Sequence, residues 1–146
     1  MNILNNCQIK YNYVLVFRGI VTQNECEKIT RDMESFVLSK RVQRVDGTIT
    51  ATHEIYDEKA DFEIIMPIDR EIEDIESNTF KLVKNFKIEN CVMINCDGNL
   101  ENVEEQIDRL YKYIEENNLK IGSPGYTFVK LNMDGGVEIE YYVSVT

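Results

Sequence analysis

Three glutamates stand beside aromatic residues on segments whose composition is typical of β-strands. Along residues 137–145 acidic and apolar residues alternate, so that Glu138, Glu140 and Tyr142 share one side of the strand. A partly buried carboxylate can bind a positive charge, and aromatic rings add apolar contact and cation–π attraction. These residue types therefore point to a receptor for a lipophilic cation. The candidate ligand-binding residues are Glu63, Glu140, Glu138, Tyr142, Tyr126, Phe128 and Tyr56.

The same alternation has a second explanation, which the sequence leaves open. Half-exposed strands routinely place charged side chains on a solvated face and apolar ones on the core face. On that alternative Glu63, Glu138 and Glu140 lie on an ordinary hydrated sheet face and bind nothing. The burial of the carboxylates decides between the two.

The first half of the chain contains a strand, a helix and a hairpin. Residues 11–21 are rich in β-branched and aromatic side chains and predict a strand. Thr22-Gln-Asn-Glu25 matches a capping box, and apolar residues at intervals of three and four predict a helix to about Arg41. Residues 48–56 and 60–68 predict an antiparallel hairpin. Residues 69–79 form an acidic connection, which could hold one helical turn.

The second half repeats this order. A strand is expected at 80–96, interrupted at about 85–90, and then a turn at Asp97-Gly98-Asn99 that offers an N-cap. The apolar spacing over 100–118 predicts the clearest helix of the chain. Residues 126–133 and 137–145 predict a second hairpin around Asp134-Gly135-Gly136. In the two hairpins the apolar faces should meet the helices: Phe62, Ile64, Met66 and Ile68, and Val137, Ile139, Tyr141, Val143 and Val145.

The two halves, at about 11–68 and 80–145, overlay without a gap at an offset of 77 residues. Sequence identities across this overlay are few, but the apolar phases of the helix and the hairpin agree. The register places Glu63 on Glu140, so this pair is the most specific prediction of a shared site. We expect a single domain over residues 1–146, of α+β class. Its duplicated strand–helix–strand–strand halves would form an antiparallel sheet with the helices on one face and a cleft between the halves.

Composition and charge narrow the function classes. The chain has 146 residues and a formal net charge of −10, from 26 acidic and 16 basic side chains, which argues against binding to nucleic acid. No stretch has the length or apolarity of a signal peptide or a membrane span, so a cytoplasmic location is expected. The four cysteines contain no C-x-x-C pair and His53 is the only histidine, so we expect reduced thiols, no metal and no cofactor.

The order of elements resembles the GyrI-like effector-binding domains, which include the ligand-binding parts of AraC-type and MerR-type bacterial regulators. The resemblance begins with the opening strand at 13–18 and the Asp97-Gly98 turn before the second helix. It continues with a glycine, a proline and an aromatic residue that lead into the penultimate strand, here Gly122, Pro124 and Tyr126. The composition, rich in Asn, Ile, Lys and Glu, is also similar to uncharacterised Gram-positive proteins encoded near type VII secretion toxins.

The resemblance to GyrI-like domains implies a ligand in a cleft between the halves, on the sheet face away from the helices, with a glutamate as the receptor for positive charge. It also implies a possible hydrolase, because some GyrI-like proteins resemble hydrolases that pair a glutamate with a tyrosine. Here Glu140 with Tyr142 or Tyr126 could imitate that pair. No serine or cysteine triad, P-loop or dinucleotide fingerprint is present, and the lone His53 is interpreted as structural or solvated.

The leading expectation is therefore a stand-alone small-molecule-binding domain of GyrI-like type without a DNA-binding part, and not an enzyme. Its ligand is expected to be cationic or amphipathic. The alternative is a protein-interaction, inhibitor or accessory role with a basic protein partner, which the acidic surface would suit. A small glutamate-dependent hydrolase is the third candidate.

Overall fold

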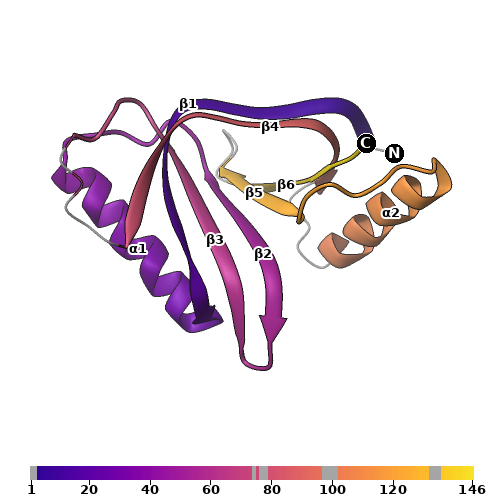
Figure 1. Ribbon diagram of the computed structural model, residues 1–146, viewed down its shortest axis with the longest axis horizontal. Coiled ribbons are helices and arrows are strands. Elements are labelled where there is room, and N and C mark those ends of the chain that lie inside the picture. The colour runs from indigo at the N-terminus through magenta and orange to yellow at the C-terminus, as the bar shows by residue number, and fades with distance from the viewer. Residues whose placement is uncertain (1–2, 74, 76–78, 97–101, 132–135) are drawn as a thin grey trace. The chain divides into compact units, whose positions relative to one another are not determined.

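The protein is an α+β chain in which antiparallel strands and two helices follow one another (Figure 1). The structure is a computed structural model and describes residues 3–73, 75, 79–96, 102–131 and 136–146. The elements are β1 (Ile3–Thr22), α1 (Gln23–Ser39), β2 (Thr48–Tyr56), β3 (Lys59–Ile68), β4 (Phe80–Cys96), α2 (Val103–Glu116), β5 (Tyr126–Leu131) and β6 (Val137–Ser144). They form two compact units, residues 10–86 (the 10–86 unit) and residues 1–9 with 87–146 (the 87–146 unit).

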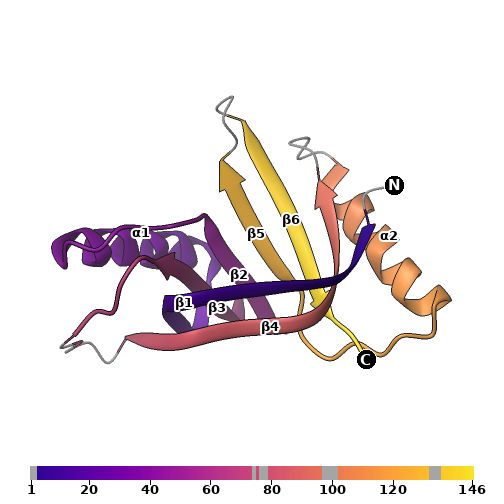
Figure 2. The ribbon, with the colours of Figure 1, turned by 90° about the horizontal axis from the view of Figure 1, so that it is seen from above.

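In the 10–86 unit, β3 is the central strand and pairs antiparallel with both β1 and β2. The helix α1 covers one face of this sheet (Figure 2). Its buried residues Cys26, Met33 and Val37 pack against Ile64 and Met66 of β3. The predicted apolar face of the first hairpin therefore does meet the helix.

The predicted capping box at the start of α1 is confirmed. The Thr22 hydroxyl accepts a hydrogen bond from the Glu25 backbone N–H at 3.2 Å, and the Glu25 carboxylate accepts one from the Thr22 N–H at 3.1 Å. These bonds satisfy two of the N–H groups that the first turn of a helix leaves without a partner. The backbone N–H of Thr22 also holds the pKa of Glu25 below its usual value.

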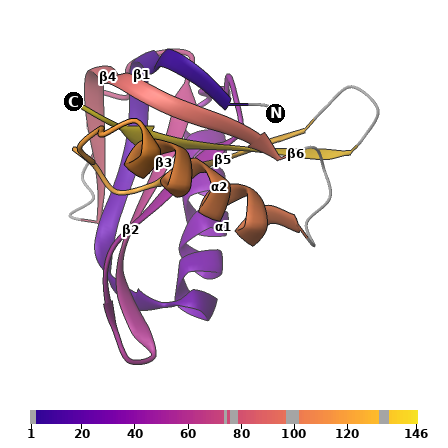
Figure 3. The same cartoon turned by 90° about the vertical axis from the view of Figure 1, so that its right-hand side faces the viewer.

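In the 87–146 unit, β6 is central and pairs antiparallel with β4 and β5. The helix α2 lies against one face of this sheet (Figure 3). Leu110 and Ile114 of α2 pack against Val92 and Ile94 of β4 and Val143 of β6, and Ile139 belongs to the same buried cluster. The predicted apolar face of the last strand is therefore the face that contacts α2.

The predicted interruption of the strand at 85–90 is wrong, because β4 runs from Phe80 to Cys96 as one strand. Polar residues suggested a break, and the structure instead places Asn85 and Asn90 at positive φ within the strand. Asparagine tolerates this backbone region better than most residues, so a local distortion replaces a loop. The described residues of the 69–79 connection contain no helical turn. The predicted turns at 97–99 and 134–135 lie outside the described residues.

The backbone at Gly125, just before β5, passes too close to the side chain of Tyr141 for any residue with a Cβ atom. A Cβ atom at Gly125 would overlap the hydroxyl of Tyr141, which is itself 2.7 Å from the hydroxyl of Tyr111. Gly122 differs, because a Cβ there would meet Ser144 only at ordinary contact distance. Gly125 thus lets the chain pass over a tyrosine pair that joins β6 to α2.

The four cysteines are free, as the sequence predicts. Cys96 belongs to the cluster beside α2, whereas Cys91 lies opposite Ser144 on the other face of the sheet. Among the described helices none combines the length and apolar character needed to cross a membrane.

Candidate functional site

Five of the seven predicted residues lie on one face of the 87–146 unit, the face that does not contact α2. In the β-ladder Glu140 is opposite Phe128 of β5, and Tyr142 is opposite Tyr126. Opposed residues of an antiparallel pair project on the same side of the sheet. Glu138, two residues before Glu140, shares this face. We call this set, Tyr126, Phe128, Glu138, Glu140 and Tyr142, the β5–β6 face.

Glu140 is a shielded carboxylate of this face, with only 12% of its side chain exposed. The Tyr142 hydroxyl donates a hydrogen bond to its Oε1 at 2.9 Å, and Tyr142 itself is 8% exposed. A hydrated strand face would leave such a carboxylate open to water, so that alternative does not fit Glu140. A shielded carboxylate attracts a cation more strongly than one in bulk water does.

The sequence reasoning missed Lys130 of β5, which completes this group. Its ammonium lies 3.0 Å from Oε1 of Glu140 and 4.6 Å from the centre of the Phe128 ring. The available signal was the alternation of Tyr126, Phe128 and Lys130 along one side of β5. The side chains of the β5–β6 face therefore already hold one positive charge, between a carboxylate and an aromatic ring.

The surroundings of Glu140 favour neutral hydroxyl and thiol groups. Burial, the hydrogen bond to Glu140 and then the Glu140 charge raise the pKa of Tyr142. Burial and, to a smaller extent, the Glu140 charge also raise the pKa of Cys7. Burial raises the pKa of Cys91 to about 11. Tyr142, Cys7 and Cys91 therefore stay uncharged at neutral pH, and the charge of Glu140 acts on the first two.

Glu138 has a different environment from Glu140. The side-chain amide of Asn95 on β4 donates a hydrogen bond to its carboxylate. Oδ1 of the same Asn95 is buried and accepts no hydrogen bond from the described residues. Glu138 is thus held by a neutral donor, while Glu140 is held by a cation and a hydroxyl.

Glu63 lies in the other unit, on the face of β3 that does not contact α1, and its partner is His53. Nε2 of His53 is 2.8 Å from Oε1 of Glu63, and the two side chains are 20% and 17% exposed. His53 is the extra residue of a bulge, because the β2–β3 register passes from Thr52 to Glu54 across successive residues of β3. A bulge re-aims a side chain. His53 is therefore hydrogen-bonded to Glu63 and mostly buried. The sequence alone allowed either a structural or a solvated role for this histidine.

The remaining predicted residue, Tyr56, lies at the exposed end of β2. It is 46% exposed, and its hydroxyl donates to Glu54 at 2.6 Å. Glu63 instead pairs with Ala51, further along the hairpin. Within the 10–86 unit, Tyr56 and Glu63 do not form one site.

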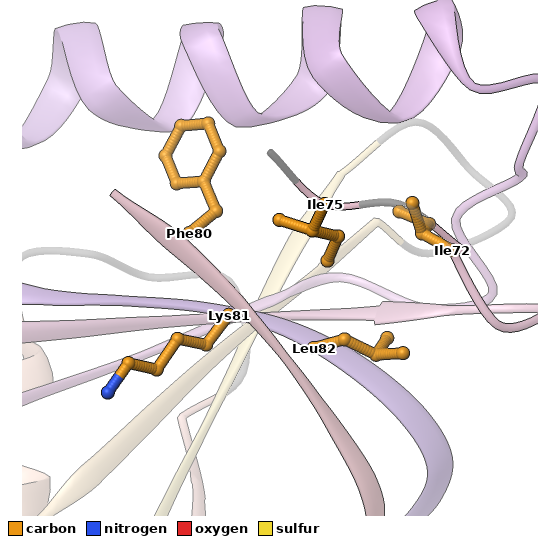
Figure 4. A pocket seen from close by; sticks show the side chains of 5 residues that line it. All are labelled: Ile72, Ile75, Phe80, Lys81 and Leu82. Atoms are coloured by element: carbon orange, nitrogen blue, oxygen red, sulfur yellow. The ribbon is translucent and has the colours of Figure 1, made fainter. Parts of the chain in front are cut away.

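Hollows of the described residues lie elsewhere in the units. One, of about 370 Å³, is lined by Ile72, Ile75, Phe80, Lys81 and Leu82 in the 10–86 unit (Figure 4). A second, of about 340 Å³, lies in the same unit and is lined by residues that include Tyr11, Val45 and Asp69. A third, of about 610 Å³, lies in the 87–146 unit, where Asn5, Asn90, Tyr113 and Asn117 are among its lining residues. None of the seven predicted residues lines any of these three hollows. Among the described residues no group of three or more His, Cys, Asp or Glu side chains could hold a metal ion.

No family model and no curated protein matches the sequence. Solved structures do match the fold. EcmrR, solved in a complex with DNA, has a TM-score of 0.72 at 16% identity over 99% of this chain. This chain spans 58% of that EcmrR chain. The separate EcmrR C-terminal domain has a TM-score of 0.67 at 11% identity, and the match covers 98% of each chain.

Two further structures share the fold along nearly their whole length. SAV2435, solved bound to tetraphenylphosphonium, has a TM-score of 0.58 at 11% identity, covering 98% of this chain and 94% of its own. A hydrolase from Listeria innocua has a TM-score of 0.60 at 11% identity, covering 97% and 91%. The chain thus shares its fold with the EcmrR C-terminal domain and with SAV2435. The comparisons do not support a link to type VII secretion toxins.

Proposed function

We propose that this chain binds a small lipophilic cation on the β5–β6 face, with Glu140 as the acceptor of positive charge. The observation that carries the proposal is the position of the Lys130 ammonium, 3.0 Å from the Glu140 carboxylate and 4.6 Å from the Phe128 ring centre. These contacts are the ones that an aromatic receptor for a cation needs. A ligand cation would replace the ammonium there.

The proposal assigns different tasks to the residues of the face. Tyr126 supplies ring surface, and the almost completely buried ring of Phe128 becomes available to a ligand when the Lys130 ammonium that lies over it moves away. Tyr142 orients the Glu140 carboxylate through its hydroxyl. Glu138 is a weaker candidate, because Asn95 already binds its carboxylate. The fold match to SAV2435, whose structure contains tetraphenylphosphonium, supports a ligand of this chemical class.

Direct binding tests the proposal. Isothermal titration with tetraphenylphosphonium should show saturable binding to the wild type and at least a tenfold weaker affinity for Glu140→Gln, since an ion–carboxylate contact in a shielded site contributes on the order of 1.4 kcal/mol or more. Glu116→Gln is the matched control, because it removes the same charge from an exposed position of α2. Equal affinity of Glu140→Gln and the wild type would contradict the proposal.

We also propose that the two units descend from a duplicated strand–helix–hairpin. Support comes from their shared element order and from the ends of the two helices, since Ser39 and Glu116 are 77 positions apart, the offset found in the sequence. The convergence of Glu63 and Glu140 in a cleft between the halves stays a prediction.

A hydrolase is the second candidate, and the His53–Glu63 contact is the observation that favours it. A histidine hydrogen-bonded to a shielded carboxylate is suited to proton transfer. Such chemistry also needs a nucleophile, and the described residues place no serine or cysteine in hydrogen-bond contact with His53. Hydrolysis of p-nitrophenyl acetate by the wild type, lost in His53→Gln, would favour this candidate. Equal rates for the two proteins would exclude a role of His53 in that reaction.

A further inference from the structure

Lys130 occupies the position that the proposed function assigns to a ligand cation. Its stem comes from β5, one residue before the end of that strand, and its ammonium lies between the Glu140 carboxylate and the Phe128 ring. The Lys130 side chain is 32% exposed, whereas Glu140 is 12% exposed. The lysine end of this ion pair therefore has more contact with water than the carboxylate end.

We propose that Lys130 is a tethered competitor that selects which cations the β5–β6 face accepts; this inference rests on the proposed function. Any cation that reaches Glu140 must displace the ammonium. The flexible lysine stem allows that displacement, because the released ammonium is strongly hydrated once it reaches water.

The competition favours one chemical class of ligand. A compact, strongly hydrated cation gains about as much from Glu140 as Lys130 loses, so it has no net advantage over the tethered ammonium. A large cation with delocalised charge loses little hydration and adds contact with the rings of Phe128 and Tyr126. Lys130 therefore makes the face selective for diffuse aromatic cations and against small ammonium ions.

Removal of Lys130 tests this selectivity. Lys130→Met keeps the apolar stem and should raise the affinity for tetraphenylphosphonium about five- to tenfold, since it removes one partly buried ion pair that the ligand must break. Methylammonium, a compact and strongly hydrated cation that should bind the wild type too weakly to detect, should give measurable binding to Lys130→Met. Lys112→Met is the matched control, because it removes an exposed lysine of α2 in the same unit and should leave both affinities unchanged.

A second measurement uses the wild type and does not depend on the folding of a variant. Acetic anhydride labelling followed by mass spectrometry reports the accessibility of each lysine. Saturation with tetraphenylphosphonium should increase the labelling of Lys130 at least twofold and leave Lys112 unchanged.

The outcomes separate the two proposals. If Lys130→Met binds tetraphenylphosphonium no tighter than the wild type, or if the ligand protects Lys130 from labelling, Lys130 is not a competitor of the ligand. Either result leaves the proposed binding of the cation at Glu140 unaffected. If the wild type does not bind, or Glu140→Gln binds equally well, the proposed function fails and the competition fails with it.

Discussion

Nε2 of His53 lies 2.8 Å from Oε1 of Glu63, although Glu63 is opposite Ala51 in the ladder of β2 and β3. His53 lies two residues after Ala51 and is the extra residue of the bulge between Thr52 and Glu54. Because both side chains are mostly buried, each depends on the other for a hydrogen bond. This pair gives the 10–86 unit its own polar contact on the face away from α1.

The first prediction concerns this pair. His53→Ala leaves the Glu63 carboxylate shielded without its partner, so the free energy of unfolding should fall by about 1.5–3 kcal/mol. A double-mutant cycle with Glu63→Gln, measured by urea denaturation, should give a coupling energy of about 1 kcal/mol or more. Lys112→Ala is the comparison, because Lys112 pairs with Glu116 at an exposed position of α2, and that change should lower the free energy of unfolding by less than about 1 kcal/mol. A coupling energy near zero would mean that the contact does not stabilise the fold.

The second prediction concerns the glycines before β5. Gly125→Ala should destabilise the protein by about 1–3 kcal/mol, because the new Cβ displaces Tyr141 and breaks its hydrogen bond to Tyr111. Gly122→Ala is the control and should change stability by less than about 1 kcal/mol. Thermal denaturation measures both variants. Equal melting temperatures of the two variants would contradict the close approach.

The third prediction is a pH dependence from Cys91. Its pKa is raised by burial from 9.0 to about 11, so the folded state keeps the thiol proton where the unfolded state has lost it. The stability from the neutral thiol is fully present below pH 9 and is lost as the pH rises from 9 to 11, by up to about 2.7 kcal/mol. Urea denaturation at pH 8, 9.5 and 11 under reducing conditions should show this loss in the wild type.

Replacement of Cys91 is the control for this pH dependence. Cys91→Ala should show a shallower fall in stability between pH 9 and 11, whatever its stability at pH 8. Cys7→Ala should change the pH dependence of the unfolding free energy less than Cys91→Ala does, because Cys7 is only partly buried. Parallel curves for the wild type and Cys91→Ala would show that this thiol does not titrate as described.

Local patterns were sufficient to predict most elements and their faces. The Thr22–Glu25 capping box depends on a spacing within one turn, and the apolar phase of β6 depends on strict alternation. Both are properties of neighbouring residues, so a single sequence contains them. The strand faces that carry Glu63 and Glu140 followed from the same alternation.

The features that failed or were missed depend on longer-range geometry. The His53–Glu63 contact depends on the register of β2 against β3, which the alternation within one strand does not give. The Lys130–Glu140 contact is diagonal, since Lys130 is opposite Glu138, and finding it requires the register of the hairpin. Asn85 and Asn90 predicted a loop because asparagine favours turns, but the neighbouring residues kept β4 continuous.

The central claim is that the β5–β6 face recognises positive charge as well as apolar surface. Tetraphenylphosphonium and tetraphenylborate have nearly the same shape and opposite charge, so the ratio of their affinities for the wild type, measured by isothermal titration, tests that claim most directly. We expect the wild type to bind tetraphenylphosphonium at least a hundredfold more tightly than tetraphenylborate. Glu140→Gln should reduce this ratio of affinities at least tenfold. Equal binding of the two ions to the wild type, or a ratio that Glu140→Gln leaves unchanged, would contradict it.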